Sequence, residues 1–165
     1  MAMKRSLAEL SPQEVLTVAI WIEERNARIY ENYAEMFEWY EPDAARAFRE
    51  MAEEEREHGR RLAALYAGRY GEAACEVTDA DIQELVEVPV VEDGEALIYD
   101  RASRRQAFDV GVQAERRARA FYAELVERTA DPALRALFDE LARVESEHEA
   151  FFVRKLAEVD PSENA

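Results

Sequence analysis

Both histidines of this chain stand three residues after a glutamate: Glu55 precedes His58, and Glu145 precedes His148. In a helix, residues three positions apart lie on one face, so each pair can direct a carboxylate and an imidazole at one point. Carboxylate oxygens and imidazole nitrogens together suit divalent transition metals. A single Glu-x-x-His pair is a weak signal in a glutamate-rich chain, but the same motif around both histidines is a stronger one.

Each Glu-x-x-His pair interrupts an apolar stripe at helical spacing. Steps of three and four residues keep a stripe on one helix face, so both pairs are expected to point into a core. Glu24 and Glu115 fall on stripes of two other expected helices, and the phase of the first stripe selects Glu24 over its neighbour Glu23. The four stripes comprise Ile20, Ala27 and Ala34; Phe48, Met51, Leu62 and Leu65; Phe108, Ala118, Tyr122 and Leu125; and Phe138, Leu141 and Phe152.

Four carboxylates and two imidazoles at one level of a core need a compensating charge. Burying an unpaired carboxylate costs several kcal/mol after relaxation, and neighbouring carboxylates also repel one another. Two divalent ions would neutralise the carboxylates and accept the imidazole nitrogens, and iron, manganese or zinc would each suit such ligands. We therefore predict a two-metal centre, which would also be the catalytic centre, with the ligands Glu24, Glu55, His58, Glu115, Glu145 and His148.

Signals for helix ends place these residues on four long helices. Ser11 and Glu14 form a capping-box pattern with Pro12 at the first helical position, and Asp131 followed by Pro132 marks another helix start. Between Gly71 and Asp100 the helical pattern breaks, over a stretch too long for a tight turn. The expected helices cover about 11–40, 42–69, 102–129 and 131–159, with a crossover at about 71–101.

The two expected hairpins repeat each other in sequence. Ordered agreement at proline, phenylalanine and histidine positions favours a true repeat over chance agreement between glutamate-rich helices. The prediction is an all-α four-helix bundle of two αα hairpins with a pseudo-two-fold repeat and one long crossover, in a single domain of residues 1–165. The matches pair Glu24–Arg28 with Glu115–Arg119, and Pro42, Phe48, Glu55 and His58 with Pro132, Phe138, Glu145 and His148.

Composition excludes several classes of function. With 37 acidic and 21 basic side chains, the formal net charge of -16 is opposite to what nucleic acid or an anionic membrane surface requires. A single cysteine excludes an internal disulfide or a four-cysteine metal site within one chain. No signal peptide and no apolar run of about 18 residues is visible, so we expect a cytoplasmic protein without a membrane span.

At these residues the chain resembles the ferritin-like superfamily, in particular the rubrerythrin (erythrin) type. It is most similar to the ferritin-like domain that precedes the transporter part of membrane-bound bacterial ferritins. The resemblance implies two iron ions per chain and assembly as a homodimer. In the implied di-iron centre, Glu55 and Glu145 bridge, Glu24 and Glu115 are terminal, and His58 and His148 bind one metal each. The likeness runs from Leu10 to Val159 and is carried by Ala19–Tyr30, Met51–Leu62 and Glu127–Ala133.

Three departures from the family bear on function. No transporter part follows, so membrane export of iron is not expected. A rubredoxin module needs four cysteines, so any electron donor would be a separate protein. Typical rubrerythrins carry a further glutamate three residues after the third-helix ligand, where this chain has Ala118. That difference favours a simple oxidase over rubrerythrin-type peroxide reduction.

The resulting hypothesis is a di-iron oxidase that binds Fe(II) and oxidises it with O₂ or H₂O₂, that is, a ferroxidase or peroxidase-type oxidoreductase. The alternatives are a peroxide reductase with a separate electron donor, a non-catalytic iron-sensing or iron-buffering domain, and a helical interaction protein without metal. Glu31 is expected to be a partly exposed residue at the bundle end rather than an iron-access site, and Cys75 receives no role. Tyr30, Tyr33 and Tyr122 either donate hydrogen bonds to ligands or only pack in the core.

Overall fold

The computed structural model describes residues 5–73, 75, 77–85 and 103–164, and no strand occurs among them. The expected all-helical class is thus confirmed for the part of the chain that is described. Much of the predicted crossover, residues 86–101, lies outside it. The elements are the 3₁₀ helix η1 (Leu7–Glu9), α1 (Pro12–Phe37), α2 (Pro42–Tyr70), α3 (Asp79–Leu85), α5 (Arg104–Arg128), α6 (Pro132–Glu158) and the 3₁₀ helix η2 (Pro161–Asn164).

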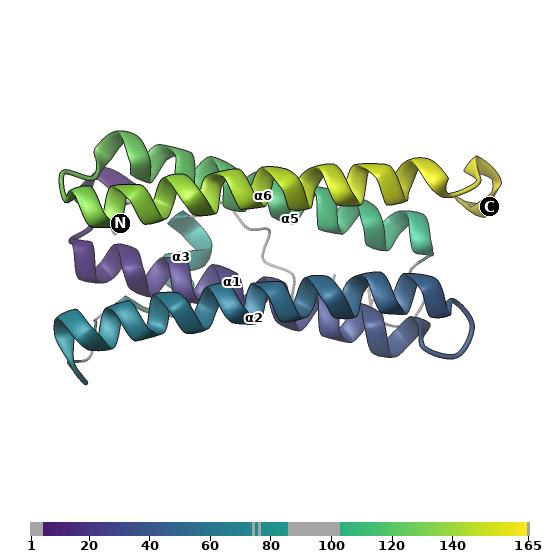
Figure 1. Ribbon diagram of the computed structural model, residues 1–165, viewed down its shortest axis with the longest axis horizontal. Helices are drawn as coiled ribbons and strands as arrows, with labels where there is room; N and C mark the ends of the chain where they lie inside the picture. Colours follow the sequence, from purple (N-terminus) through teal and green to yellow (C-terminus); the bar gives the residue numbers. More distant parts are fainter. Residues whose placement is uncertain (1–4, 74, 76, 86–102, 165) are drawn as a thin grey trace. The chain divides into compact units, whose positions relative to one another are not determined.

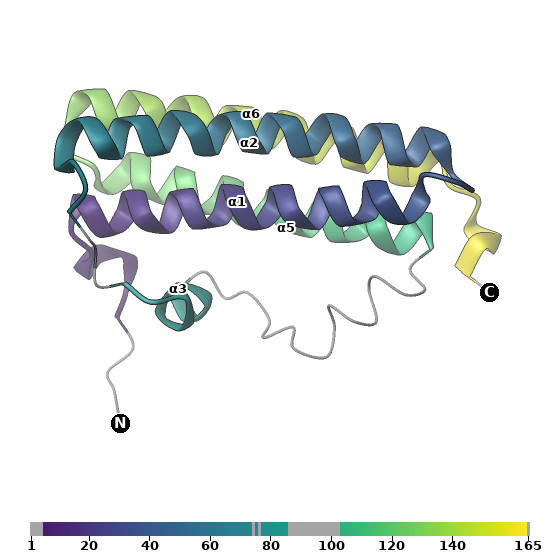
Figure 2. The same cartoon turned by 90° about the horizontal axis from the view of Figure 1, so that it is seen from below.

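The chain divides into two compact units, Met1–Val91 and Glu92–Ala165. In the first unit α1 packs along α2, and in the second α5 packs along α6, so that each unit is built on an antiparallel helical hairpin (Figures 1 and 2). The two hairpins are the two halves of the sequence repeat. The assignment of residues 1–165 to one domain stays a prediction.

Helices α1 and α6 start where the sequence signals placed them. The Ser11 hydroxyl accepts a hydrogen bond from the Glu14 amide, and the Glu14 carboxylate accepts one from the Ser11 amide at 2.7 Å. The Asp131 carboxylate accepts from two amides at the start of α6. Such caps satisfy amides that have no partner inside the helix.

Two helix ends differ from the prediction. Helix α1 ends at Phe37 rather than near Tyr40, and a turn follows in which the Tyr40 and Glu41 amides donate hydrogen bonds to the Phe37 carbonyl, at 3.3 and 2.9 Å. Helix α5 begins at Arg104, after a capping box formed by Ser103 and Gln106 that we did not predict.

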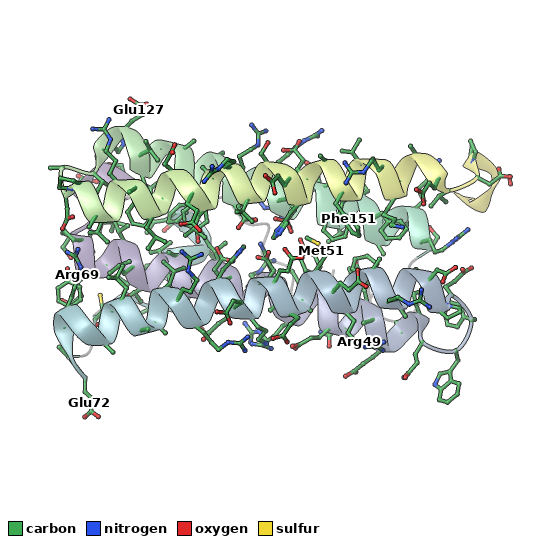
Figure 3. The ribbon with its side chains drawn as sticks, in the orientation of Figure 1. Arg49, Met51, Arg69, Glu72, Glu127 and Phe151 are labelled. Carbon is green, nitrogen blue, oxygen red and sulfur yellow. The ribbon has the colours of Figure 1, made fainter. Side chains whose placement is uncertain are left out.

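In the first hairpin, aromatic rings set the register of α1 against α2. The ring of Phe48 lies 5.0 Å from Tyr33 and 6.0 Å from Tyr30, measured between centroids, and all three rings are fully buried. Farther along α2, Met51 is buried while Arg49 projects from the opposite side of the helix (Figure 3). The second hairpin has an equivalent contact, with Tyr122 stacked on Phe138 at 6.2 Å.

A glycine permits close packing in the second hairpin. A Cβ atom added at Gly111 of α5 would lie 2.8 Å from the ring of Phe152 on α6, which is fully buried. In the first hairpin, a Cβ atom at Gly59 would meet the Cβ atom of Glu23 at 3.6 Å, an ordinary van der Waals distance.

These two glycines give a matched stability test. Gly111→Ala should lower the free energy of unfolding by about 1–3 kcal/mol relative to Gly59→Ala, because overpacking forces the Phe152 ring to move. Gly59→Ala should be neutral or stabilise by up to ~1 kcal/mol, because alanine favours helix. Urea unfolding of both variants in chelator, followed by circular dichroism, measures the difference. Equal stabilities would contradict the close approach at Gly111.

Candidate metal centre

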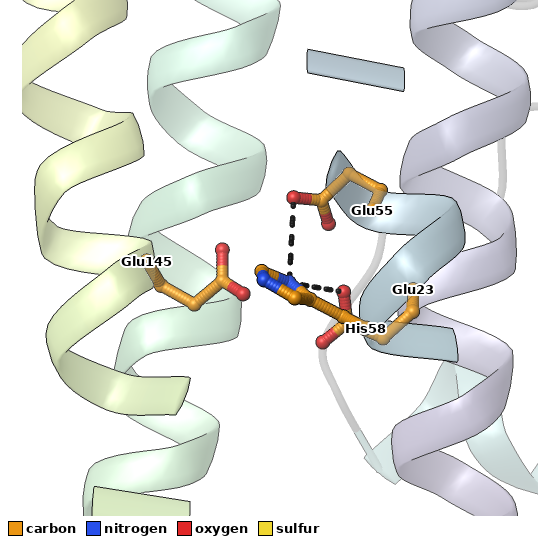
Figure 4. Close-up of side chains that lie close together, drawn as sticks. All are labelled: Glu23, Glu55, His58 and Glu145. Atoms are coloured by element: carbon orange, nitrogen blue, oxygen red, sulfur yellow. Dashed lines mark ion pairs between the residues drawn. The ribbon is translucent and has the colours of Figure 1, made fainter. Parts of the chain in front are cut away.

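The first hairpin brings two carboxylates and one imidazole together in its buried interior. The Nδ1 atom of His58 lies 3.4 Å from Glu23 Oε2 and 3.9 Å from Glu55 Oε1 (Figure 4). Glu23 comes from α1, and the other two residues come from α2. Both glutamates are fully buried, and His58 is 7% exposed. We call Glu23, Glu55 and His58 the first trio.

The second hairpin contains the same arrangement. The Nδ1 atom of His148 lies 3.4 Å from Glu145 Oε2 and 3.7 Å from Glu115 Oε2. Glu115 comes from α5, Glu145 and His148 come from α6, and all three are buried. We call these residues the second trio.

The spacing within each trio suits a bound cation. Each residue offers one ligand atom, and the three atoms of a trio lie within 4.8 Å of one another. Ligand atoms bind an ion such as zinc at about 2.0–2.2 Å, so two ligand atoms of one ion are at most about 4.4 Å apart. The spacing within each trio, up to 4.8 Å, is only slightly wider than that. Two carboxylate oxygens and one imidazole nitrogen form a mixed donor set that fits iron, manganese or zinc. Each trio could therefore hold one metal ion.

The structure corrects one predicted site residue. Glu24 is exposed on the outside of α1, whereas its neighbour Glu23 is fully buried beside His58. The prediction that Glu24 rather than Glu23 faces the core is therefore wrong. The other five predicted ligands all lie in the two trios. The buried face of α1 runs through Leu16, Ala19, Glu23, Asn26, Tyr30, Tyr33 and Phe37.

A signal for Glu23 was present in the sequence. If the repeat between the first and third long helices is shifted by one residue, Tyr30 matches Tyr122 and Glu23 matches Glu115. Both tyrosines are fully buried, so this alignment also matches the buried faces. The alignment chosen from the sequence relied instead on the charged residues that follow Glu24, which lie mainly on the outside of the helix.

Burial controls the ionisation of the second trio. The pKa of Glu115 is raised well above its usual range, first because burial disfavours the carboxylate anion and then because Glu145 lies beside it. A hydrogen bond with His148 acts in the opposite direction. A protonated carboxyl is a poor metal ligand, so a cation bound here would replace the proton.

The remaining residues singled out from the sequence lie outside the trios. The Glu31 carboxylate accepts two hydrogen bonds from the Arg56 guanidinium, at 2.9 and 2.7 Å, on the partly exposed side of the first hairpin. Tyr30, Tyr33 and Tyr122 are fully buried. Cys75 is partly exposed and is not in either trio.

Comparison with known proteins identifies the family. Residues 14–156 match the Rubrerythrin family, and the chain therefore belongs to the rubrerythrin family of the ferritin-like superfamily. No curated protein matches the chain. The match confirms the resemblance found in the sequence and the ferritin-like fold class. The closer likeness to membrane-bound ferritins stays a prediction. None of the helices in the described part of the chain contains an apolar stretch that could span a membrane.

Glu23 and Glu24 provide a test with adjacent residues. Glu23→Ala should weaken metal binding by tenfold or more, because it removes a buried carboxylate beside His58. Glu24→Ala should leave the affinity unchanged, because that side chain is exposed. Metal titration by calorimetry, with elemental analysis of the dialysed proteins, measures both effects. An equal loss in the two variants would contradict the assignment of Glu23.

The raised pKa of Glu115 predicts a pH dependence for the metal-free protein. The unfolded chain loses the Glu115 proton at about pH 4.3, whereas the folded protein retains it to higher pH. The folded state therefore binds more protons above pH 4.3, and its free energy of unfolding falls as pH rises toward the raised pKa. Glu115→Gln should remove this contribution. Urea unfolding in chelator at several pH values tests it, and parallel curves for the two proteins would contradict it.

Proposed function

We propose that each trio holds one iron ion and that the two ions together form a di-iron centre that oxidises Fe(II) with O₂ or H₂O₂. The observation that carries the proposal is the matched pair of buried trios, in a chain that belongs to the rubrerythrin family. The repeat of the two hairpins supports the pairing of the two ions. By the resemblance to the family, Glu55 and Glu145 would be the bridging ligands of this centre and Glu115 a terminal one, and Glu23 would take the terminal role that the sequence assigned to Glu24.

Two Fe(II) ions supply two electrons on conversion to Fe(III). Two electrons and two protons reduce O₂ to H₂O₂, or H₂O₂ to two water molecules. The protein's residues bind the ions, hold them in an interior shielded from water, and neutralise their charge with carboxylates. The four carboxylates also favour the higher charge of Fe(III), which makes oxidation easier.

One buried residue favours the oxidase over rubrerythrin-type peroxide reduction. Ala118 lies three residues after Glu115, on the same face of α5, and is 1% exposed. This is the position where typical rubrerythrins carry a further glutamate. The methyl group cannot bind a metal, so the second hairpin supplies no additional carboxylate there.

Assembly as a homodimer and a cytoplasmic location are parts of the proposal that rest on the sequence alone.

An anaerobic Fe(II) titration followed by addition of oxidant tests the function. The protein should bind two Fe(II) per chain, and O₂ or H₂O₂ should then produce a ligand-to-metal absorption band. Glu55→Ala and His148→Ala should each remove at least one iron, because each variant loses a ligand of one trio. Glu54→Ala is the matched control, since its side chain is exposed beside Glu55 on α2.

The outcomes separate the candidate functions. Rapid oxidation by O₂ or by H₂O₂, with release of Fe(III), supports an oxidase and identifies its oxidant. Turnover that needs a reduced protein donor together with H₂O₂ would favour a peroxide reductase. Iron that binds and leaves without oxidation would favour a buffer or sensor. Wild-type protein that binds no iron would overturn the proposal.

A further inference from the structure

Asn26 is a buried polar residue that is not one of the proposed iron ligands. It lies on α1 and is 3% exposed. Its Nδ2 atom carries two donor hydrogens and has no hydrogen-bond partner among the described residues. Buried donors in proteins are almost always paired, because leaving one unpaired forfeits the hydrogen bonds it would make with water. We therefore expect the Nδ2 atom of Asn26 to donate a hydrogen bond to an acceptor atom of a molecule that binds nearby.

The helix register places Asn26 beside the first trio. Asn26 is three residues after Glu23, on the same buried face of α1. Because α1 and α2 are antiparallel and Glu23 lies opposite His58, three residues forward on α1 correspond to three residues back on α2. That step leads from His58 to Glu55. Asn26 thus lies at the level of Glu55, within one helical turn of the atoms that would hold the metal.

The second hairpin has no such donor. In the alignment that matches Glu23 with Glu115, the equivalent of Asn26 is Ala118, whose methyl group is buried and carries no polar atom. The two trios repeat the same ligand types, but the position one turn beyond the terminal glutamate differs. A hydrogen bond to a molecule at the centre is therefore available from this position only on the first hairpin.

We propose that Asn26 Nδ2 donates a hydrogen bond to a small anion bound at the metal of the first trio. The ligand class is a one- to three-atom anion with an oxygen or nitrogen acceptor, such as hydroxide or azide. A bound metal ion attracts such an anion. The carboxylates of Glu23 and Glu55 only accept hydrogen bonds, so they cannot donate one to the anion. The amide is neutral, so it stabilises the anion without competing with the metal for the ligands. This inference rests on the proposed function, because that proposal supplies the metal ion to which the anion binds.

Azide titration of the oxidised, iron-loaded protein tests the proposal. Asn26→Ala should weaken azide binding by tenfold or more, the loss expected when one hydrogen bond to a charged group is removed. Its iron content should stay at two per chain. Asn32→Ala is the matched control, because Asn32 lies on the same helix and is exposed. The control should bind azide like the wild type.

Asn26→Asp provides a second variant of nearly identical shape. It replaces the donor nitrogen with an acceptor oxygen, so it should also weaken azide binding, and it keeps the test valid if Asn26→Ala fails to fold. Iron-loaded variants with wild-type azide affinity would overturn the inference and leave the proposed function intact. Wild-type protein that binds iron but no azide would do the same. Wild-type protein that binds no iron would overturn both proposals together.

Discussion

The structure depends on one constraint: carboxylates on the buried faces of helices need positive charge close by. Glu23, Glu55, Glu115 and Glu145 are all fully buried, and each lies near an imidazole. An imidazole carries at most one charge and is neutral when it binds a metal, so the histidines do not balance the carboxylates. Without a cation, protons must take its place, as the raised pKa of Glu115 indicates. Protons and metal ions therefore compete for the same oxygens.

The apolar packing of each hairpin serves this constraint by fixing where the carboxylates lie. In the first hairpin, the contacts of Phe48 with Tyr30 and Tyr33 set the register that brings Glu23 opposite His58. In the second, the stacked rings of Tyr122 and Phe138 do the same on one side of the trio. On the other side of that trio, the close contact of Gly111 with Phe152 sets the register of α5 against α6. A trio is thus held by rigid helices rather than by loops, which keeps its ligand atoms close together.

Charge outside the two trios has a different role. Exposed acidic side chains pair with arginines, as Glu53 and Glu57 do with Arg60 at 2.8 Å each, and such pairs contribute only about 0–1 kcal/mol each. The net charge of -16 still favours the approach of cations to the protein. Inside, the chemistry is less symmetric than the repeat suggests, because Asn26 and Ala118 occupy equivalent positions with different hydrogen-bonding capacity. The two halves of the repeat have the same ligand types but different residues at the position one turn beyond the terminal glutamate.

The sequence by itself determined the helices, the two Glu-x-x-His motifs and the family. These follow from local patterns: capping residues, proline positions and apolar residues at steps of three and four. Five of the six predicted ligands lie in the trios for the same reason. Tertiary structure decided between Glu23 and Glu24, because neighbouring residues on a helix are only about 100° apart and the apolar face is at least as wide as that. Only the packing of α1 against α2 determines which of the two glutamates is buried beside His58 and which meets water.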